Sequence, residues 1–190
     1  MMGISENNQR ADARANRAKI IECARGALAR EPGVPLSSIA KMAGVGPGTL
    51  YRHFPNRETL VLAVYQHEID TVAEYATKLV AKYPPVDAFR LWCGRLVNLG
   101  QMKQGLAGVL STVMSERDIP YLRELYSPIL GAMEYLLRTG EASGEFISGV
   151  DAEDVMQLLG FIWRIQRDAA GLARIERLVT LVVRSLVETN

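Results

Sequence analysis

Two short apolar-patterned segments joined at a single glycine constrain this chain more than any other feature of its sequence. The first, LSSIAKMA at residues 36–43, places its apolar side chains at helical spacing. Gly44 follows, and glycine ends a helix well because it adopts a left-handed backbone conformation at no steric cost. The second segment, GPGTLYRHF at residues 46–54, carries Leu50 and Phe54 on its inner side. The pattern predicts two short helices that cross at a tight turn, which is a helix-turn-helix.

The outward side of the second segment is rich in hydrogen-bond donors. The side chains that carry them are Thr49, Tyr51, Arg52 and His53. Gly46, Pro47 and Gly48 leave the start of this helix nearly free of side chains, so it can approach a phosphate or a base edge closely. The alternatives are that Tyr51 and His53 form a packed aromatic pair, and that the motif is structural in a protein that does not bind DNA.

Helical periodicity continues through the rest of the chain, and no run of alternating β-branched residues predicts a strand. The 190 residues are 48% hydrophobic, which is enough for a core. The expected helices span residues 11–30, 36–43, 46–54, 56–83 after an Asn56 N-cap, 86–103, 106–115, 120–143 with a kink or restart at Pro128, 151–165 after an Asp151 N-cap, and 172–188 after a break at Gly171. The predicted fold class is all-α, with an N-terminal three-helix helix-turn-helix domain and a larger C-terminal helical domain.

Charge is divided unevenly along the chain, although the net charge is only +1. Residues 1–58 carry nine Lys and Arg against five Asp and Glu, whereas residues 59–190 carry thirteen against sixteen. A basic N-terminal part is a weak indication that the protein binds a polyanion, and a chance distribution of charge is the alternative. Arg14 and Lys19 on the first helix are interpreted as solvated charges rather than phosphate contacts. Residues 1–10 are polar and are expected to form a disordered tail.

Several function classes find no support in the sequence. No apolar stretch follows the N-terminal charges and no uncharged run reaches about 20 residues, so neither a signal peptide nor a membrane span is predicted. Cys23, Cys93, His53 and His67 form no metal-binding pattern. No serine or cysteine has a base placed by a motif, and the acids at residues 151–154 suit a helix N-terminus. The expectation is a cytoplasmic protein with reduced thiols, no metal, no cofactor and no enzymatic activity.

The segment LSSIAKMAGVGPGTLYRHFPNRETLVLAV resembles the DNA-binding part of the TetR/AcrR family of bacterial transcriptional regulators. The resemblance rests on the ordered runs I-A-x-x-A-G-V, G-T-L-Y-x-H-F and R-E-x-L, and it covers residues 15–65. It implies that Thr49, Tyr51 and His53 contact DNA phosphates. It also implies that Arg57, where the family usually has lysine, clamps a phosphate bidentately.

The sequence departs from the family pattern at the start of the recognition helix. Gly46 stands where the family usually has Ser or Thr, so a side-chain cap is lost. Pro47 stands where a base-reading side chain often lies, and proline cannot donate a hydrogen bond. Base readout is therefore expected to depend on Arg52, on Ser37 or Ser38, or on DNA shape.

The second half of the chain resembles a ligand-domain branch of the same family over residues 89–165. The resemblance implies a pocket between helices for a small apolar or amphipathic ligand. Plain helical core is the alternative for the same residues, because Met and aromatic side chains at helical spacing are usually core. The pocket candidates are Phe89, Trp92, Cys93, Leu96, Met102, Met114, Tyr126, Met133 and Trp163.

The last two predicted helices have apolar faces too wide for one chain to cover. This predicts a two-fold four-helix dimer interface, and TetR-like proteins dimerise in this way. The interface candidates are Val155, Leu159, Ile162, Leu178, Leu181, Val182, Ser185 and Leu186. The expected organisation is a tail at 1–10, a DNA-binding domain at 11–58, and a ligand-binding and dimerisation domain at 59–190.

The function that the resemblance implies is transcriptional regulation. The chain is expected to be a homodimeric repressor that binds a palindromic operator in double-stranded DNA and is released when the small ligand binds. The alternatives are a repressor that is ligand-independent or regulated by a partner, and an activator. No membrane partner is expected.

Overall fold

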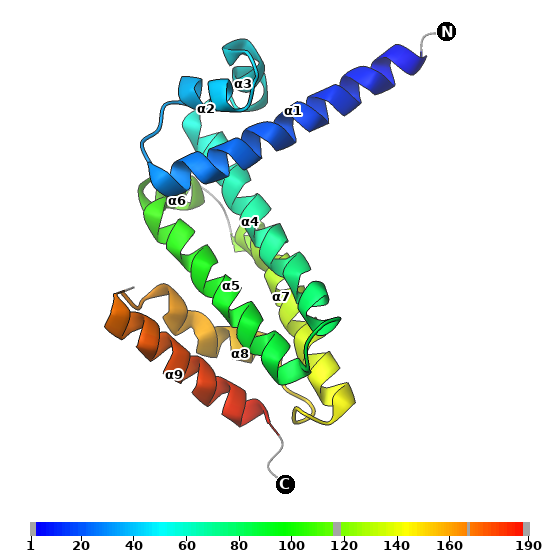
Figure 1. Ribbon diagram of the computed structural model, residues 1–190, viewed down its shortest axis with the longest axis vertical. Helices are drawn as coiled ribbons and strands as arrows, with labels where there is room; N and C mark the ends of the chain where they lie inside the picture. Colours follow the sequence, from blue (N-terminus) through cyan, green and yellow to red (C-terminus); the bar gives the residue numbers. More distant parts are fainter. Residues whose placement is uncertain (1–2, 116–118, 167, 188–190) are drawn as a thin grey trace. The chain divides into compact units, whose positions relative to one another are not determined.

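The structure, a computed structural model, describes residues 3–115, 119–166 and 168–187, and these residues are almost entirely helical (Figure 1). Their elements are α1 (Gly3–Arg30), α2 (Leu36–Met42), α3 (Pro47–His53), α4 (Arg57–Val80), α5 (Pro85–Gly105), α6 (Ala107–Ser115), α7 (Ile119–Ser143), α8 (Ala152–Leu159), the 3-10 turn η1 (Gly160–Trp163) and α9 (Ala169–Leu186). The predicted all-α fold class is confirmed, and α2 and α3 form the predicted helix-turn-helix. None of the helices in the described ranges is both long and apolar enough to cross a membrane.

The chain divides into two compact units. Unit 1 comprises Met1–His67 and Gly105–Glu116, and unit 2 comprises Glu68–Gln104 and Arg117–Asn190. The division differs from the predicted boundary after residue 58, because it falls inside α4 and because α6 groups with the N-terminal unit. Helical periodicity identifies helices but not the helices that each one packs against, so the sequence pattern gave no sign of either feature.

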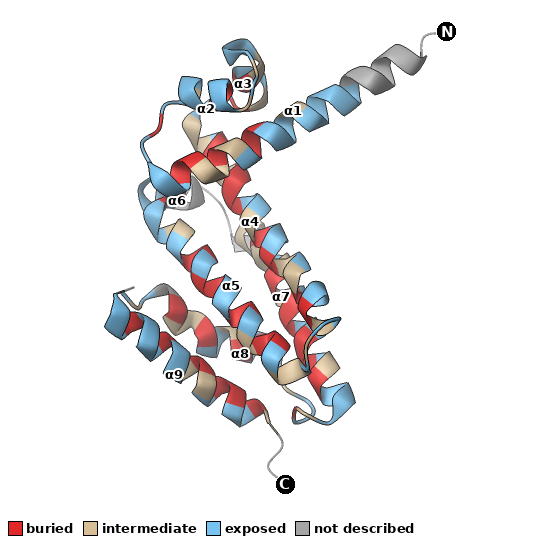
Figure 2. Cartoon of the chain, viewed as in Figure 1, coloured by how far each residue is buried: buried red, intermediate tan, exposed pale blue. Residues whose placement is uncertain are grey.

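The core of unit 1 joins α1 to the two short helices. Ile20 and Ala24 of α1, Ile39 of α2 and Leu50 of α3 are all fully buried. Figure 2 shows the buried residues of α1 gathered in its C-terminal half. Gly44 has a φ of +68°, the left-handed conformation predicted for the turn.

The helix α1 is longer than predicted. It begins at Gly3, inside the segment predicted to be a disordered tail, rather than at residue 11. The polar composition of this segment indicates that it cannot form a core of its own. It is helical nonetheless, because adding residues to an existing helix avoids the cost of starting a new one.

Both predicted N-caps are present. Asn56 Oδ1 accepts a hydrogen bond from the Thr59 N–H at 2.9 Å before α4. Asp151 Oδ1 accepts hydrogen bonds from the N–H groups of Glu153 at 2.7 Å and Asp154 at 3.2 Å before α8. These bonds satisfy N–H groups that have no partner within the helix, so they position the start of α4 and the start of α8.

In unit 2, two side chains of α5 donate hydrogen bonds to helices that are distant in sequence. The indole N–H of Trp92 donates to the Val72 carbonyl of α4 at 2.9 Å. The Arg90 guanidinium donates to Thr180 Oγ1 of α9 at 3.0 Å. The helix α8 packs against both α7 and α9, as Figure 1 shows, so its apolar side is covered by its own chain.

The helix α7 is continuous through Pro128, so it does not restart there. Two other features of unit 2 differ from the sequence prediction. The helix α8 ends at Leu159 and passes into η1, so its predicted span is too long. Gly171 lies in the first turn of α9, where its N–H donates to Asp168 Oδ1 at 2.7 Å and where an added Cβ would overlap the Gln166 carbonyl. Glycine is needed there for close backbone approach, not to break the helix.

Candidate functional site

The side chains predicted to contact DNA lie on α2, at the turn before α3, on α3 itself and at the start of α4. Tyr51 is 49% exposed, which favours an accessible phenol over the packed aromatic pair. His53 is half-buried, with its ring centroid 6.3 Å from that of Phe54. The other predicted residues on these elements are also accessible: Ser37, Ser38, Gly46, Pro47, Gly48 and Arg52 are exposed, and Thr49 is half-buried.

The first turn of α3 presents little besides backbone. Gly46 is the N-cap residue and no side chain caps the helix, as expected for glycine, while Pro47 occupies the first helical position. Arg52 folds back over this turn, where its Nε donates to the Gly48 carbonyl at 3.2 Å and its Nη2 to Thr49 Oγ1 at 3.3 Å. A guanidinium and a hydroxyl therefore share one place on the exposed face, which suits a phosphate or a base-edge acceptor.

Arg57 is bound to the backbone of its own chain, and its predicted contact with a DNA phosphate stays a prediction. Its Nη1 donates to the Val34 carbonyl at 2.7 Å, and its Nη2 donates to the Pro32 carbonyl. Both carbonyls lie between α1 and α2, whereas Arg57 is the first residue of α4. The guanidinium therefore ties these elements together. No sequence motif indicates such a contact, because its acceptors are main-chain atoms far away in sequence.

The nine pocket candidates differ in burial. Those buried in unit 2 are Phe89, Trp92, Cys93, Leu96 and Met133. Met102 and Tyr126 are half-buried, and the side chains of Met114 and Trp163 lie outside those that the structure describes. Burial raises the pKa of the Cys93 thiol to about 12, so this thiol stays neutral and unreactive near neutral pH. That these residues form the wall of a ligand pocket stays a prediction.

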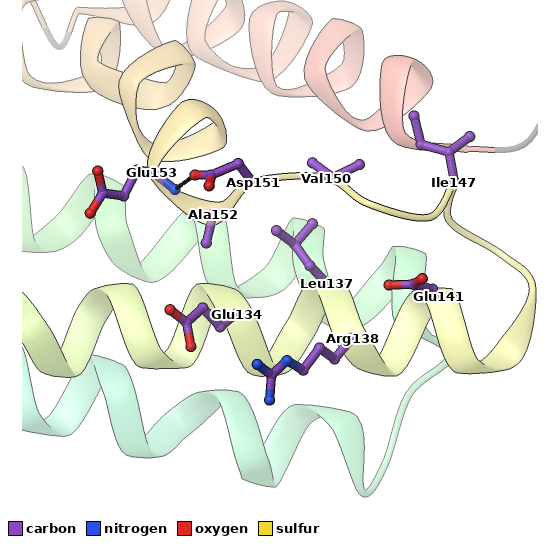
Figure 3. A pocket seen from close by; sticks show the side chains of 9 residues that line it. All are labelled: Glu134, Leu137, Arg138, Glu141, Ile147, Val150, Asp151, Ala152 and Glu153. Carbon is purple, nitrogen blue, oxygen red and sulfur yellow. Dashed lines mark hydrogen bonds between the residues drawn. The ribbon is translucent and has the colours of Figure 1, made fainter.

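A pocket of about 280 Å³ lies elsewhere in unit 2, where α7 meets the start of α8 (Figure 3). Its lining residues are Glu134, Leu137, Arg138, Glu141, Ile147, Val150, Asp151, Ala152 and Glu153. Four carboxylates and one guanidinium make this pocket polar, and none of the nine predicted candidates lines it. Within the described ranges, no three His, Cys, Asp or Glu side chains are grouped so that they could hold a metal ion.

The eight candidates for the predicted dimer surface differ in burial. Five of them are buried within the single chain: Val155, Leu159, Ile162, Val182 and Leu186. Leu178 is half-buried, Ser185 is exposed and Leu181 is 58% exposed. Leu158, which was not among the candidates, is also 58% exposed. The apolar pattern identified the inner faces of α8 and α9, which pack against each other.

The helix-turn-helix in unit 1 and the donor-bearing face of α3 define the class of protein: a helical DNA-binding regulator. Residues 32–64 match the family described as bacterial regulatory proteins of the tetR family. Residues 84–187 match the family described as the C-terminal domain of SbtR-like transcriptional regulators. The chain therefore belongs to the TetR family of DNA-binding transcriptional regulators.

Known proteins resemble the chain to different extents. The crystal structure of a TetR transcriptional regulator from Streptomyces coelicolor is 34% identical, with a TM-score of 0.75 over 92% of this chain and 99% of that one. LfrR from Mycobacterium smegmatis, solved in complex with proflavine, shares the fold with a TM-score of 0.58 at 18% identity, over 93% and 98% of the two chains. An HTH-type transcriptional regulator of Staphylococcus aureus is 40% identical over 63 residues, which are 32% of this chain and span only 34% of that regulator.

Proposed function

We propose that this chain is a homodimeric repressor that binds a palindromic operator in double-stranded DNA through α3. In this proposal a small apolar or amphipathic ligand binds unit 2 and releases the protein from DNA. The observation that carries the DNA-binding step is the exposed face of α3, where the Tyr51 phenol is accessible and Arg52 is bonded over Thr49. Phenol, guanidinium and hydroxyl groups contact phosphates and base edges in DNA complexes. The protein would act in the cytoplasm, where bacterial DNA lies.

A second copy of this chain is the partner proposed for the outer faces of α8 and α9. Leu158 of α8 and Leu181 of α9 are each 58% exposed. Asp154 lies one turn before Leu158, whereas Arg177 and Arg184 lie one turn on either side of Leu181, and all three are exposed. In a two-fold four-helix interface, α8 of one protomer meets α9 of its partner. In that arrangement the exposed leucines of the two helices would pack together, and Asp154 would lie near the arginines of the partner's α9. Both contacts favour this pairing.

Release by a ligand needs a link between unit 2 and the helix-turn-helix. The helix α4 is continuous and contributes residues to both units. A ligand that favours a different position of α4 would change the spacing between the two α3 helices of a dimer. Those helices must lie about 34–36 Å apart, or a multiple of that, to enter successive major grooves. A coupling of about 1–3 kcal/mol changes DNA affinity about 5–150-fold.

The ligand class is supported by composition and by fold. The buried candidates around Trp92 and Met133 are apolar, and a pocket among them would take an apolar or amphipathic molecule. LfrR, which has this fold, was solved with proflavine bound. A ligand-independent or partner-regulated repressor, or an activator, is the alternative. Mass spectrometry of the extracted protein and a reporter fused to the operator separate these possibilities.

The DNA-binding step is tested by a mobility shift with a promoter fragment from the gene's own neighbourhood, against random DNA as competitor. Tyr51→Ala is expected to abolish specific retardation while leaving the protein folded. Tyr135→Ala is the matched control, because Tyr135 is 41% exposed on α7. Retardation of Tyr51→Ala equal to that of the wild type contradicts the proposed role of α3. Loss of folding in that variant favours the packed aromatic pair.

The dimer is tested by charge insertion into α9. Leu181→Asp is expected to shift the protein to monomer in sedimentation experiments, since it places a buried carboxylate in the proposed interface. Leu172→Asp is the matched control, because Leu172 is 46% exposed on the same helix but lies half a rotation away. Equal behaviour of the two variants counts against this interface.

A further inference from the structure

The face of α1 that packs into unit 1 continues toward the N-terminus as a row of arginines. The buried members of this face are Ile21, Ala24 and Leu28. Intervals of four, three and four residues back from Ile21 lead to Arg17, Arg14 and Arg10. Residues at these intervals stack on one side of a helix, so all six side chains share one face. We call Arg10, Arg14 and Arg17 the arginine row.

The arginine row lies on the side of α1 that faces α3. The Arg17 guanidinium carbon is 5.3 Å from the centroid of the Phe54 ring. Phe54 is the C-cap residue of α3 and is only 2% exposed. This contact sets the direction of the row, because Arg14 and Arg10 continue the same face by about 5 and 10 Å along the helix axis.

Beyond Arg17 the row is exposed: Arg10 and Arg14 both have exposed side chains. Figure 1 shows the N-terminal turns of α1 extending past α2 and α3, and Figure 2 shows the segment before the core as exposed. Arg10 and Arg14 are exposed, and no described residue forms a hydrogen bond or ion pair with either. Asp12 and Lys19 lie on the opposite side of the helix. The three arginines of the row are therefore accessible.

We propose that the arginine row is a second DNA-contacting element, which binds the phosphate backbone beside the groove that α3 enters. A duplex is the partner that fits, since α3 brings DNA to the side of α1 that Arg17 occupies. Guanidinium groups bind phosphates strongly and read no bases. The row would therefore lengthen the stretch of backbone that the protein covers and raise affinity on every sequence. This inference replaces the interpretation of Arg14 as a merely solvated charge.

The experiment compares two variants that lose one positive charge from the same helix. Arg14→Ala removes the middle of the row, and Lys19→Ala removes an exposed cation from the opposite side. Arg17 is left intact because it contacts Phe54. The probe is an operator duplex selected from a random library with the wild-type protein, and its affinity is measured from about 50 to 200 mM salt by mobility shift.

Arg14→Ala is expected to lower the slope of log affinity against log salt by about 0.9 per protomer, and Lys19→Ala by much less. A dimer has two such arginines, so the slope falls by about 1.8 in total. Raising the salt from about 50 to 200 mM should then weaken DNA binding by the variant about twelvefold less than it weakens binding by the wild type. The double variant Arg10→Ala/Arg14→Ala should lower the slope further. Equal slopes for Arg14→Ala and Lys19→Ala overturn the proposal. Circular dichroism verifies that the variants remain helical.

A second measurement varies the DNA instead of the protein. The wild type should bind an operator with about one helical turn (about 10 bp) added at each end more tightly than a duplex that ends at the core site. Arg10→Ala/Arg14→Ala should lose this preference, while Tyr51→Ala should lose specific binding to both duplexes. If the double variant still binds the longer duplex more tightly than the shorter one, the proposal is overturned. That result would not affect the proposed role of α3.

Discussion

Replacing Arg57 decides whether this side chain is a structural tether or a phosphate clamp. The structure supports the tether, because the guanidinium donates to the carbonyls of Val34 and Pro32. The perturbation is a pair of substitutions. Arg57→Ala removes both hydrogen bonds, whereas Arg57→Lys keeps the charge but lacks the planar fork that reaches two acceptors at once.

The magnitude follows from the two contacts. A hydrogen bond from a charged donor contributes about 1.5–3 kcal/mol, and the bond to Val34 at 2.7 Å is part-buried. The bond to Pro32 is exposed and contributes less. Arg57→Ala should therefore lower the free energy of unfolding by about 2 kcal/mol, and Arg57→Lys by about half as much. For a chain of 190 residues that melts as one transition, 2 kcal/mol corresponds to a fall in Tm of about 4–8 °C.

The assay pairs thermal unfolding with the salt dependence of operator binding. A tether predicts a lower Tm and an unchanged salt slope. The clamp implied by the family resemblance predicts an unchanged Tm and a slope reduced by about 0.9 per protomer. A reduced slope in Arg57→Ala with no loss of Tm would refute the tether. Arg57→Lys sharpens the comparison, since a lysine preserves a phosphate contact better than it preserves two carbonyl contacts.

Three further substitutions or labelling experiments test the packing of unit 2. Gly140→Ala should destabilise the protein by about 1–3 kcal/mol in chemical denaturation, because its Cβ would lie 2.5 Å from Cγ of the buried Phe146 ring; a gain in stability would show that the ring can move aside. Asp151→Ala should cost about 1 kcal/mol through the lost cap of α8, and Asp151→Asn much less. At pH 8 a thiol reagent should label the half-buried Cys23 quickly. Cys93 should react only after denaturant is added, because burial raises its pKa to about 12. Equal labelling rates for the two cysteines would contradict the burial of Cys93.

The helix-turn-helix and its function could be predicted because their signals are local. The turn at Gly44, the caps of Asn56 and Asp151 and the apolar side of α2 each depend on residues a few positions apart. The donor-bearing face of α3 could be read for the same reason. Side chains at helical spacing share a face whatever else the chain does.

The partners of those faces could not be predicted in the same way. The family resemblance assigns Arg57 to a phosphate and gives no sign of its carbonyl acceptors, which only the folded chain brings near it. The apolar patterns of α8 and α9 indicated burial correctly, yet Leu159 is covered within the chain and Leu158 is exposed. A pattern shows that a side chain avoids water, and it does not show whether its own chain or a second copy provides the cover.

The sequence by itself therefore determined the helices, the tight turn and the chemistry displayed by α3, since these follow from backbone preferences and spacing within single elements. The tertiary structure decided the grouping of α6 with unit 1, the binding of Arg57 to the loop before α2, and the direction of the arginine row on α1. The physical reason is that packing and long-range hydrogen bonds depend on which elements meet in space. Residues far apart in sequence meet only when the whole core of a unit has formed.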